Sequence, residues 1–398
     1  MLQGRRIVLG VTGSIACYKA ADLASKLTQA GALVDVILTD AAREFISPLT
    51  FRALTARPVY TNMYDPQSAL AEEHVALARS CDAMIIAPAS ATTIARLAYG
   101  LADDMVALTA LATRAPVIVA PAMDGQMWTH AATQENVAKL RERGVFIAGP
   151  AEGRLASGHS GQGRLLETDM LIGALRQALG ANGDLAGRRL VVSAGGTQEP
   201  IDPVRYIGNR SSGKMGFAIA EAARDRGAAV TLVCGPVSLA TPYGIDRVDV
   251  RTTAEMQAAI VTATAQCDAL VMAAAPADFR AANAADQKIK RTEATLTVEL
   301  APNDDILASL DGPFVKVGFA AETEGLIEHA RDKVARKGLD LIAANDVSAS
   351  DAGFATETNR LTLIDREGTV EHLPLLSKYD AASRLLDRVV ALIATRAR

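Results

Sequence analysis

The sequence predicts an α/β protein made of two doubly wound, Rossmann-like domains. At 398 residues the chain is long for one domain, since a domain usually holds about 100–200 residues. Apolar residues make up 49% of the chain and aromatic residues only 4%, which is typical of parallel aliphatic sheets covered by helices. Short apolar runs alternate with glycine turns and helical patterns in both halves, as βαβ units require.

In the first half, apolar runs bounded by turn signals predict strands at 5–10, 33–39, 82–88 and 115–121. Helical periodicity predicts helices at 16–30, 40–55, 90–113, 131–143 and 168–179. Right-handed crossovers between such strands place ligands at the carboxyl ends of the strands. The glycine-rich stretch 149–164 has no periodicity, so it is either a linker or a functional flap over a site.

The pattern restarts after GANGDLAGRR, where glycine and polar residues cluster and predict a domain boundary. We therefore expect domains at 1–183 and 184–398. Strands are expected at 188–196, 228–234, 267–275, 314–320 and 339–345, and helices at 213–226, 253–265, 323–337 and from about 376.

Composition narrows the function classes. The net charge of −4 argues against broad binding to nucleic acid or membranes, and no apolar run approaches the roughly 20 residues of a membrane span. The four cysteines are scattered without CxxC spacing, which favours free thiols in a reducing compartment. We therefore expect a cytoplasmic protein.

Several segments have the composition of anion-binding loops. Gly13 and Ser14 lie in a turn between a strand and a helix, where backbone N–H groups face an anion or the glycine serves only the turn. The segment 208–215 nearly matches a P-loop, but Met215 replaces the hydroxyl residue, so we reject an ordinary P-loop. It still favours an anionic ligand, because Asn209 and basic side chains precede a helix. KIKR at 288–291 either faces a phosphate or is a solvated charge run.

The motifs become specific when they are taken in order. GVTGSIACYKA, APAS, PAM-x-x-x-MW, GR-x-x-SG-x-x-G-x-GR, SAGGTQEPIDPVRYIGNRSSGKMG, AAAPADF, KIKR, GFAAET and LIAANDV follow one another along the chain. This order resembles the bifunctional phosphopantothenoylcysteine decarboxylase / phosphopantothenate–cysteine ligase family of coenzyme A biosynthesis. The resemblance covers nearly the whole chain and is strongest in the second half.

For the first half, the resemblance implies a flavodoxin-like domain that binds FMN. The flavin would be surrounded by Gly13, Ser14, Ile15, Thr39 and Ser90, and His74 would be the active-site histidine. The flavin is needed because the cysteinyl carboxylate has no adjacent electron sink, and oxidation at the thiol side supplies one before CO2 is lost.

Two positions depart from the family pattern. Asp124 stands where the family has Asn, and Ser157 stands where the flap normally carries Cys. Both are expected in the catalytic site. We hypothesise that the changes compensate, with Asp124 having a raised pKa beside the substrate carboxylate and serving as hydrogen-bond donor and proton source. The alternative is an active ligase joined to a flavin domain with lost or altered decarboxylase activity.

For the second half, the resemblance implies a ligase that uses CTP and Mg²⁺ to join 4′-phosphopantothenate to L-cysteine through an acyl-cytidylate. Asn209 and Lys288 would be catalytic, and no magnesium ligand can be assigned. The implied CTP contacts are Ala273, Ala274, Ala275, Asp278, Lys288, Asp304, Asp305, Ile306, Leu307, Phe319, Lys333 and Lys337.

The resemblance also implies a homo-oligomer, with trimeric flavin domains and dimeric ligase domains, whose only other partners are small-molecule substrates. Two other functions stay open on the sequence. An NAD-dependent dehydrogenase would need G-x-G-x-x-G followed by an acidic residue about 20 positions on, which the chain lacks. A non-catalytic flavoprotein subunit is compatible with Asp124 and Ser157, although the intact ligase motifs argue against it.

Overall fold

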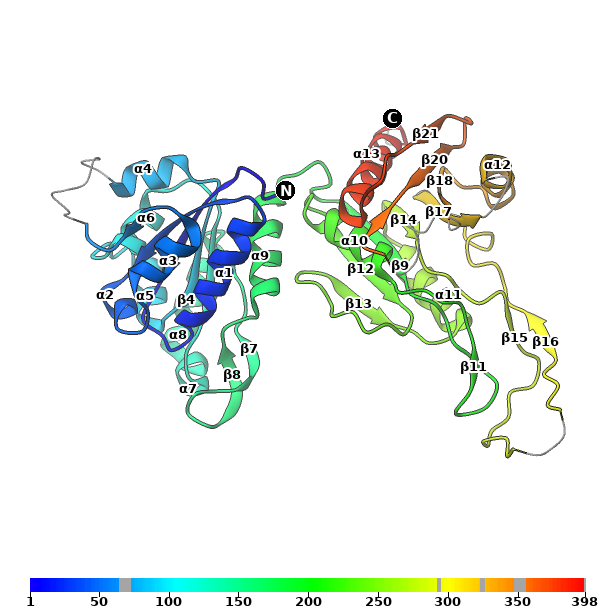
Figure 1. Cartoon of the computed structure of the whole chain (residues 1–398), viewed down its shortest axis with the longest axis horizontal. Helices are drawn as coiled ribbons and strands as arrows, with labels where there is room; N and C mark the ends of the chain where they lie inside the picture. The colour runs from blue at the N-terminus through cyan, green and yellow to red at the C-terminus, as the bar shows by residue number, and fades with distance from the viewer. Residues whose placement is uncertain (64–72, 292–294, 323–325, 347–355, 397–398) are drawn as a thin grey trace. The chain divides into compact units, whose positions relative to one another are not determined.

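The computed structural model describes residues 1–63, 73–291, 295–322, 326–346 and 356–396. The chain divides into two compact units, Met1–Gly180 and Ala181–Arg398, called unit 1 and unit 2 below. Each unit contains a largely parallel sheet covered by helices, as Figure 1 shows. The predicted α/β class with two doubly wound domains is therefore confirmed.

The sheet of unit 1 has the strand order β3-β2-β1-β4-β5-β6, and its strands are parallel to their neighbours. The strands are β1 (Arg6–Val11), β2 (Leu33–Leu38), β3 (Val59–Tyr60), β4 (Ala83–Ala89), β5 (Val117–Pro121) and β6 (Phe146–Ile147). The strand order reverses between β1 and β4. In doubly wound sheets a ligand crevice forms at the carboxyl ends of the strands at such a point.

Capping residues set the helices of unit 1, and two predicted helices are each divided by a cap. Ser47 accepts a hydrogen bond from Leu49 and starts a helix with Pro48, while Asp104 caps another after Gly100 has ended the preceding helix at φ 70°. The helices are α1 (Cys17–Gln29), α2 (Asp40–Arg43), α3 (Pro48–Thr55), α4 (Glu73–Ser80), α5 (Ala91–Tyr99), α6 (Met105–Ala112), α7 (Gly125–Thr129), α8 (Ala131–Glu142) and α9 (Thr168–Gly180).

The glycine-rich stretch 149–164 is a flap rather than a linker. It forms an antiparallel hairpin of β7 (Ala151–Arg154) and β8 (Ser160–Arg164). The backbone N–H of Met123 donates to the carbonyl of Gly163 at 2.9 Å, which ties the hairpin to the loop after β5. Gly163 is required here, since a Cβ would lie 2.2 Å from the carbonyl oxygen of Met123.

The main sheet of unit 2 has the order β13-β12-β9-β14-β17-β18-β20-β21. Its strands are β9 (Arg189–Ala194), β12 (Ala229–Cys234), β13 (Asp246–Asp249), β14 (Ala269–Met272), β17 (Val315–Glu322), β18 (Leu341–Asp346), β20 (Leu361–Asp365) and β21 (Val370–His372). The last two are antiparallel additions that the sequence did not predict. A mixed sheet edge is common in doubly wound folds.

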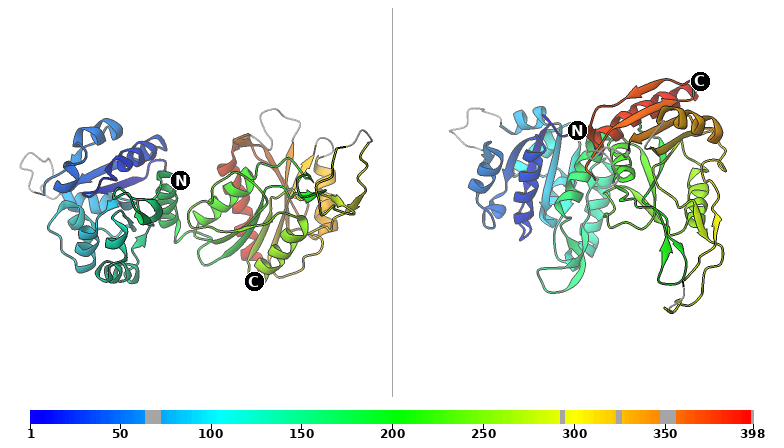
Figure 2. Two further views of the ribbon diagram at one scale, coloured as in Figure 1. Left: turned by 90° about the horizontal axis from the view of Figure 1, so that it is seen from below. Right: turned by 45° about the vertical axis from the view of Figure 1, so that its right-hand side comes forward.

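Three two-stranded ribbons lie beside this sheet, and their strands are too short for periodicity to reveal. They pair β10 (Glu199–Pro200) with β11 (Tyr206–Ile207), β15 (Phe279–Ala281) with β16 (Leu300–Pro302), and β19 (Thr358–Asn359) with β22 (Leu376–Ser377). The first two ribbons extend away from the sheet, as Figures 1 and 2 show. We call β15, β16 and the loop joining them the arm.

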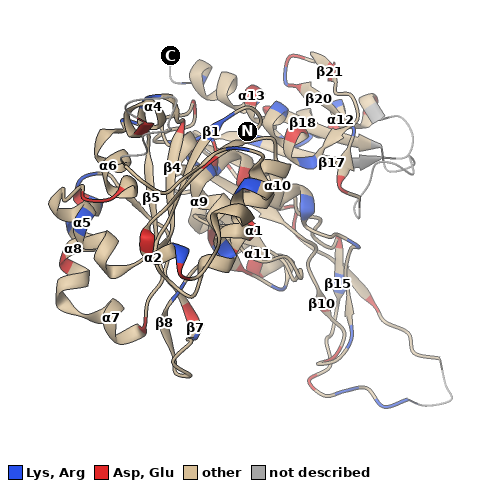
Figure 3. Cartoon of the chain, turned by 60° about the vertical axis from the view of Figure 1, so that its left-hand side comes forward, with Lys and Arg blue, Asp and Glu red and all other residues tan. Residues whose placement is uncertain are grey.

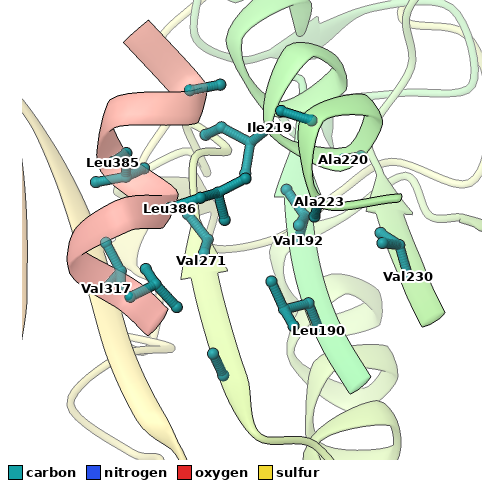
Figure 4. Packing of buried hydrophobic residues seen from close by; sticks show 14 of the residues in the cluster. Leu190, Val192, Ile219, Ala220, Ala223, Val230, Val271, Val317, Leu385 and Leu386 are labelled. Carbon is teal, nitrogen blue, oxygen red and sulfur yellow. The ribbon is translucent and has the colours of Figure 1, made fainter. Parts of the chain in front are cut away.

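Helices α10 (Lys214–Arg224) and α13 (Lys378–Arg396) cover one face of this sheet, and α11 (Thr253–Thr264) and α12 (Leu326–Lys337) cover the other. Figure 4 shows Ile219 of α10 and Leu386 of α13 packed over Val192 and Val271. Gly216 lets α10 approach β9, because a Cβ there would lie 2.6 Å from the Cβ of Ala194. The packing of α10 and α13 against the sheet places the first residues of both helices at its carboxyl edge. Within the described residues, no helix combines the length and apolar character of a membrane span.

Candidate active sites

Unit 1 has a cavity of about 580 Å³ beside the carboxyl ends of β1 and β5. The loop after β1, the loop after β5 and the flap contribute its walls. Four of the predicted site residues line it, namely Ser14, Ile15, Asp124 and Ser157. Tyr18, Lys19, Arg154 and Arg164 also line the cavity, and the sequence reasoning did not single them out.

The other predicted cofactor residues lie at adjacent strand ends but do not line this cavity. Thr12 joins the ends of β1 and β4, since its Oγ1 donates to the Pro88 carbonyl and accepts from the Ser90 N–H, each at 2.9 Å. Ser90 and Thr39 cap α5 and α2 with their side chains. Gly13 packs against α2, where a Cβ would lie 2.6 Å from the Cβ of Ala41. The parallel register of β2, β1 and β4 brings these residues to one edge of the sheet.

The two residues that depart from the family pattern contact each other directly. The Ser157 hydroxyl donates to Oδ2 of Asp124 at 2.7 Å, although the two lie 33 positions apart. Asp124 caps α7 by accepting from the Gln126 N–H at 3.1 Å. Ser157 comes from the exposed turn of the flap. The contact therefore depends on the flap lying over the loop after β5.

The contacts that Asp124 makes within the chain lower the pKa of its carboxyl, whereas the raised pKa of our hypothesis depends on a substrate carboxylate beside it. The Ser157 hydroxyl lowers the pKa of this carboxyl below its usual value, and the Gln126 N–H and the charge of His159 lower it further against a smaller effect of burial. Asp124 is therefore ionised in the free site. A raised pKa would require the substrate carboxylate itself.

His74 is not brought to Asp124 and Ser157. It lies half-buried in the first turn of α4 and lines no cavity described here. Figures 1 and 3 place α4 at the end of unit 1 opposite α7 and the flap. Within one chain the predicted catalytic histidine is thus separate from the other predicted catalytic residues of unit 1.

Unit 2 has a cavity of about 640 Å³ at the carboxyl edge of its sheet. The structure brings seven predicted site residues together around it: Asn209, Ala273, Ala274, Ala275, Asp278, Phe319 and Lys333. The loop before α10, the segment after β14, strand β17 and helix α12 supply these residues. Lys214 and Met215, from the segment 208–215 in which an anionic ligand was expected, line the same cavity, as do Asn345, Asn359 and Lys378, to which the sequence assigned no role.

Asn209 holds two walls of this cavity together. Its Nδ2 donates to the carbonyl of Pro276 at 2.8 Å and lies 3.4 Å from that of Ala275. The Ala275 N–H donates to the Gly195 carbonyl at 2.8 Å, so the segment after β14 is also fixed to the turn after β9. An asparagine held in this way presents its remaining amide atoms to a ligand.

Lys288 lies outside the cavity. It is exposed on the arm, whose basic stretch appears in blue in Figure 3. The neighbouring Ile289 is tied down instead, because its N–H donates to buried Asp202 at 3.1 Å and its carbonyl accepts from Arg205. The backbone of Ile289 is therefore anchored, while the side chain of Lys288 lies in solvent. The structure therefore does not bring this predicted catalytic residue to the others.

The turn 304–307 and Lys337 also lie outside the cavity lining. Ile306 and Leu307 are buried in the core beneath β17, which fixes the turn. Lys337 pairs with Asp305 at 2.9 Å. Burial raises the pKa of the Asp305 carboxyl, but Lys337 and the Ala308 N–H outweigh it and hold the pKa below its usual value. Lys333, one helical turn earlier, lines the cavity.

No residue set for a metal ion was predicted, and the described part of the chain contains no group of three or more His, Cys, Asp or Glu placed to hold one. Mg²⁺ does not need such a group, because it commonly binds through one or two carboxylates together with substrate phosphates and water.

The fold defines a two-unit α/β protein with a cavity at the carboxyl edge of each sheet, and comparison with known families shows that it belongs among the flavoproteins. Residues 1–180 match the family model described as "Flavoprotein", and residues 185–393 match "DNA/pantothenate metabolism flavoprotein C-terminal domain". The second match covers more than half of the chain.

Full-length relatives identify the family. Coenzyme A biosynthesis bifunctional protein CoaBC of Vibrio cholerae is 46% identical over 97% of this chain and 98% of its own. The Escherichia coli K12 protein of that name is 46% identical over 98% of this chain and 97% of its own, and the Bacillus subtilis protein is 43% identical over 98% of both chains. The chain belongs to the CoaBC family of bifunctional enzymes of coenzyme A biosynthesis, which have a decarboxylase and a ligase activity.

Solved structures align with each half separately. The C-terminal domain of a CoaBC protein is 34% identical, covering 54% of this chain and 99% of that one, with a TM-score of 0.47. The FMN-dependent cysteine decarboxylase SpaF is 31% identical, and the alignment covers 45% of this chain and 99% of that one, with a TM-score of 0.39.

Proposed function

We propose that residues 1–183 carry an FMN-dependent decarboxylase and residues 184–398 a CTP-dependent ligase. The ligase joins 4′-phosphopantothenate to L-cysteine, and the decarboxylase converts the product to 4′-phosphopantetheine. The observation that carries this proposal is that four of the predicted residues line one cavity in unit 1 and seven line one cavity in unit 2, together with full-length similarity to CoaBC proteins. A cytoplasmic location belongs to the same proposal, supported by four free cysteines.

The cavity of unit 1 has the character of a flavin site. Its volume of about 580 Å³ is in the usual range for ligand pockets of about 300–1,000 Å³. Ile15, Tyr18, Leu155 and Leu165 give it apolar walls, and Ser14 with the backbone of the first turn gives it a polar end. Bound FMN would supply the reversible oxidation that makes loss of CO2 possible.

In this site Asp124 and Ser157 act as one unit. A substrate carboxylate that binds beside the ionised Asp124 would raise the pKa of the Asp124 carboxyl, because two negative charges at short range repel each other. Asp124 then takes up a proton, which it holds toward the substrate, and Ser157 orients it through their shared hydrogen bond. Substrate binding and proton uptake are therefore linked.

Calorimetry in buffers of different ionisation enthalpy tests this linkage. Binding of phosphopantothenoylserine, which keeps the carboxylate but lacks the thiol that is oxidised and so is not decarboxylated, should take up about one proton near neutral pH in the flavin-loaded enzyme, and Asp124→Asn should abolish the uptake. Binding of the decarboxylated product should take up none. Equal uptake by the wild type and Asp124→Asn would remove Asp124 from this role.

His74 completes the decarboxylase site only if a second copy of the chain supplies it. Support for this comes from the separation of α4 from the flap within unit 1 (Figure 1). A trimer of flavin units and a dimer of ligase units are part of the proposal. Mixing inactive His74→Ala and inactive Asp124→Ala chains should restore activity in hybrid oligomers, whereas sites contained in single chains would stay inactive.

The ligase reaction proceeds in two displacements. The carboxylate of phosphopantothenate attacks the α-phosphorus of CTP and expels pyrophosphate, which forms an acyl-cytidylate. The neutral amine of L-cysteine then attacks the acyl carbon, the C–O bond to CMP breaks, and the amine proton is released. Asn209 would hold the acyl phosphate, Lys333 would offset charge on the phosphates, and Mg²⁺ would bind through those phosphates.

One incubation separates the alternatives. Purified enzyme with phosphopantothenate, L-cysteine, CTP and Mg²⁺ should yield phosphopantetheine and one equivalent each of CMP and pyrophosphate. Accumulation of phosphopantothenoylcysteine instead would show that the ligase works while the decarboxylase is lost or altered, the alternative that Asp124 and Ser157 raise. Absence of CTP-dependent pyrophosphate release would refute the ligase assignment.

A further inference from the structure

The cavity of unit 2 has an end that none of the predicted nucleotide contacts occupies. Asn345 of β18, Asn359 of β19 and Lys378 of α13 line it, together with Lys214 and Met215 at the start of α10. We call this region the β18–α13 end. Strand β18 lies two strands from β14, so about 10 Å separates their carboxyl ends. Both ends nevertheless open into one cavity.

Asn345 is the feature that points to a ligand. Its side chain is 7% exposed, and among the described residues its Oδ1 has no hydrogen-bond partner. A buried carbonyl oxygen without a partner is costly, and native structures rarely keep one without a reason. Asn359, by contrast, is partnered, since its Oδ1 accepts from the Arg360 N–H at 3.0 Å. Asn345 therefore requires a donor from the cavity.

The charge of this end suits a single carboxylate. Lys378 is only 5% exposed, and its Nζ donates to the carbonyls of Thr356 and Thr358 at 2.7 and 3.3 Å. Lys214 forms an ion pair with Glu357. Two lysines and one glutamate give one net positive charge. Burial lowers the pKa of Lys378 and the charge of Lys214 lowers it further, so an incoming carboxylate would be stabilised there.

The β18–α13 end requires a hydrogen-bond donor for Asn345 and one negative charge for its net positive charge. An amino acid supplies both, whereas a phosphate group supplies only the negative charge. Phosphate oxygens carry no donor for Oδ1 of Asn345, and pyrophosphate has more negative charge than this end would neutralise. An α-amine brings N–H donors, and the neighbouring α-carboxylate brings a single negative charge. The thioether of Met215 gives the same end a soft, polarisable wall of the kind that a thiol side chain contacts.

We propose that the β18–α13 end is the binding site for L-cysteine, with the amine on Oδ1 of Asn345 and the carboxylate toward Lys378 and Lys214. The proposal rests on the ligase function proposed above. It makes Asn345 a binding residue for the second substrate. The amine would then share one cavity with the activated acyl group held at Asn209.

Steady-state kinetics of Asn345→Ala tests this assignment. The KM for L-cysteine should rise at least about 10-fold, which corresponds to about 1.4 kcal/mol. Exchange of labelled pyrophosphate into CTP, measured with phosphopantothenate and no cysteine, should stay at the wild-type rate, which also shows that the variant folds. Asn182→Ala changes an exposed asparagine at the start of unit 2, is the matched control and should change neither quantity.

Other outcomes have distinct meanings. A fall in exchange with an unchanged KM for cysteine would overturn the proposal and assign Asn345 to the nucleotide. No change in either quantity would also overturn it. Absence of exchange in the wild-type enzyme would refute the proposed ligase function itself, which the first two outcomes leave intact.

A second measurement uses the wild-type enzyme, so it does not depend on the folding of a variant. Cysteamine keeps the amine and thiol of cysteine but lacks the carboxylate. Its kcat/KM should be at least about 10-fold lower than that of L-cysteine if a lysine-lined end holds the carboxylate. Equal use of the two amines would contradict the placement of the carboxylate at Lys378 and Lys214.

Discussion

Both units contain a largely parallel sheet, but the connections that carry their site residues differ in length. In unit 1 a short hairpin brings Ser157 onto Asp124, and the contact is a hydrogen bond of 2.7 Å. In unit 2 the residues at the strand ends converge, whereas Lys288 stays exposed on the arm. The flap from Ala151 to Arg164 is 14 residues long and is tied to the loop after β5 by the Met123–Gly163 hydrogen bond, while β15 and β16 extend beyond the sheet.

The comparison teaches that distance from a strand end decides whether a motif residue is positioned before substrate binds. Residues that follow a buried strand directly, such as Ala275 and Asp124, are fixed by the register of the sheet. Residues on a long connection need a further contact to reach the site. Asp124 and Ser157, the two departures from the family pattern in unit 1, both lie in short connections.

The largest expected effect lies in unit 1. Asp124→Ala should lower the rate of decarboxylation about 10³-fold, in the range of a lost general acid, while Ser157→Ala should lower it only about 10-fold. Formation of phosphopantetheine from phosphopantothenoylcysteine measures both. Ligase activity should be unchanged in each variant. A fully active Asp124→Ala enzyme would contradict the role given to this carboxyl.

In unit 2, Lys288→Ala should lower ligase kcat/KM about 10- to 100-fold, since a charge-assisted hydrogen bond contributes about 1.5–3 kcal/mol. Such a loss would mean that the arm approaches the cavity when nucleotide binds. Lys290→Ala, also exposed on the arm, serves as the control and should be near wild type. An unchanged rate in Lys288→Ala would identify this residue as a solvated lysine.

A double-mutant cycle sharpens the comparison within unit 1. Asp124→Asn and Ser157→Cys restore the family pattern one position at a time. Because the residues share a hydrogen bond, each single change should impair decarboxylation, and the double variant should be about 10-fold more active than additivity predicts. Additive effects would show that the two departures are independent.

The smallest effect concerns the turn beneath β17. Lys337→Ala should raise the KM for CTP no more than about 5-fold, since a partly exposed ion pair contributes about 0–1 kcal/mol. The pKa of Asp305 is lowered, so the pair persists below the usual pKa of aspartate and is lost as pH falls through the lowered value. When the titration of the Asp305 carboxyl is followed, it should become protonated at a higher pH in Lys337→Ala than in the wild type. Identical titration curves would show that Lys337 does not lower the pKa of Asp305.

The sequence by itself determined the fold class, the main strands and the residues that follow them. Apolar runs such as 82–88 and 115–121 became β4 and β5 because a buried parallel strand needs little beyond local hydrophobicity. The motif order also determined the family. Since parallel strands share one carboxyl edge, the sequence placed Ala275 and Asp278 at that edge without coordinates, and the family resemblance assigned Asn209 to the same site.

Only the tertiary structure decided which of these residues meet. No local pattern reports that Ser157 contacts Asp124, that His74 lies apart from both, or that Ile289 rather than Lys288 is anchored. Asn345 and Lys378 were missed for the same reason. Asn345 belongs to the motif LIAANDV, but its unpartnered oxygen depends on β17, β20 and the cavity around it. Lys378 carries no signal at all, because its burial arises from packing between segments distant in the sequence.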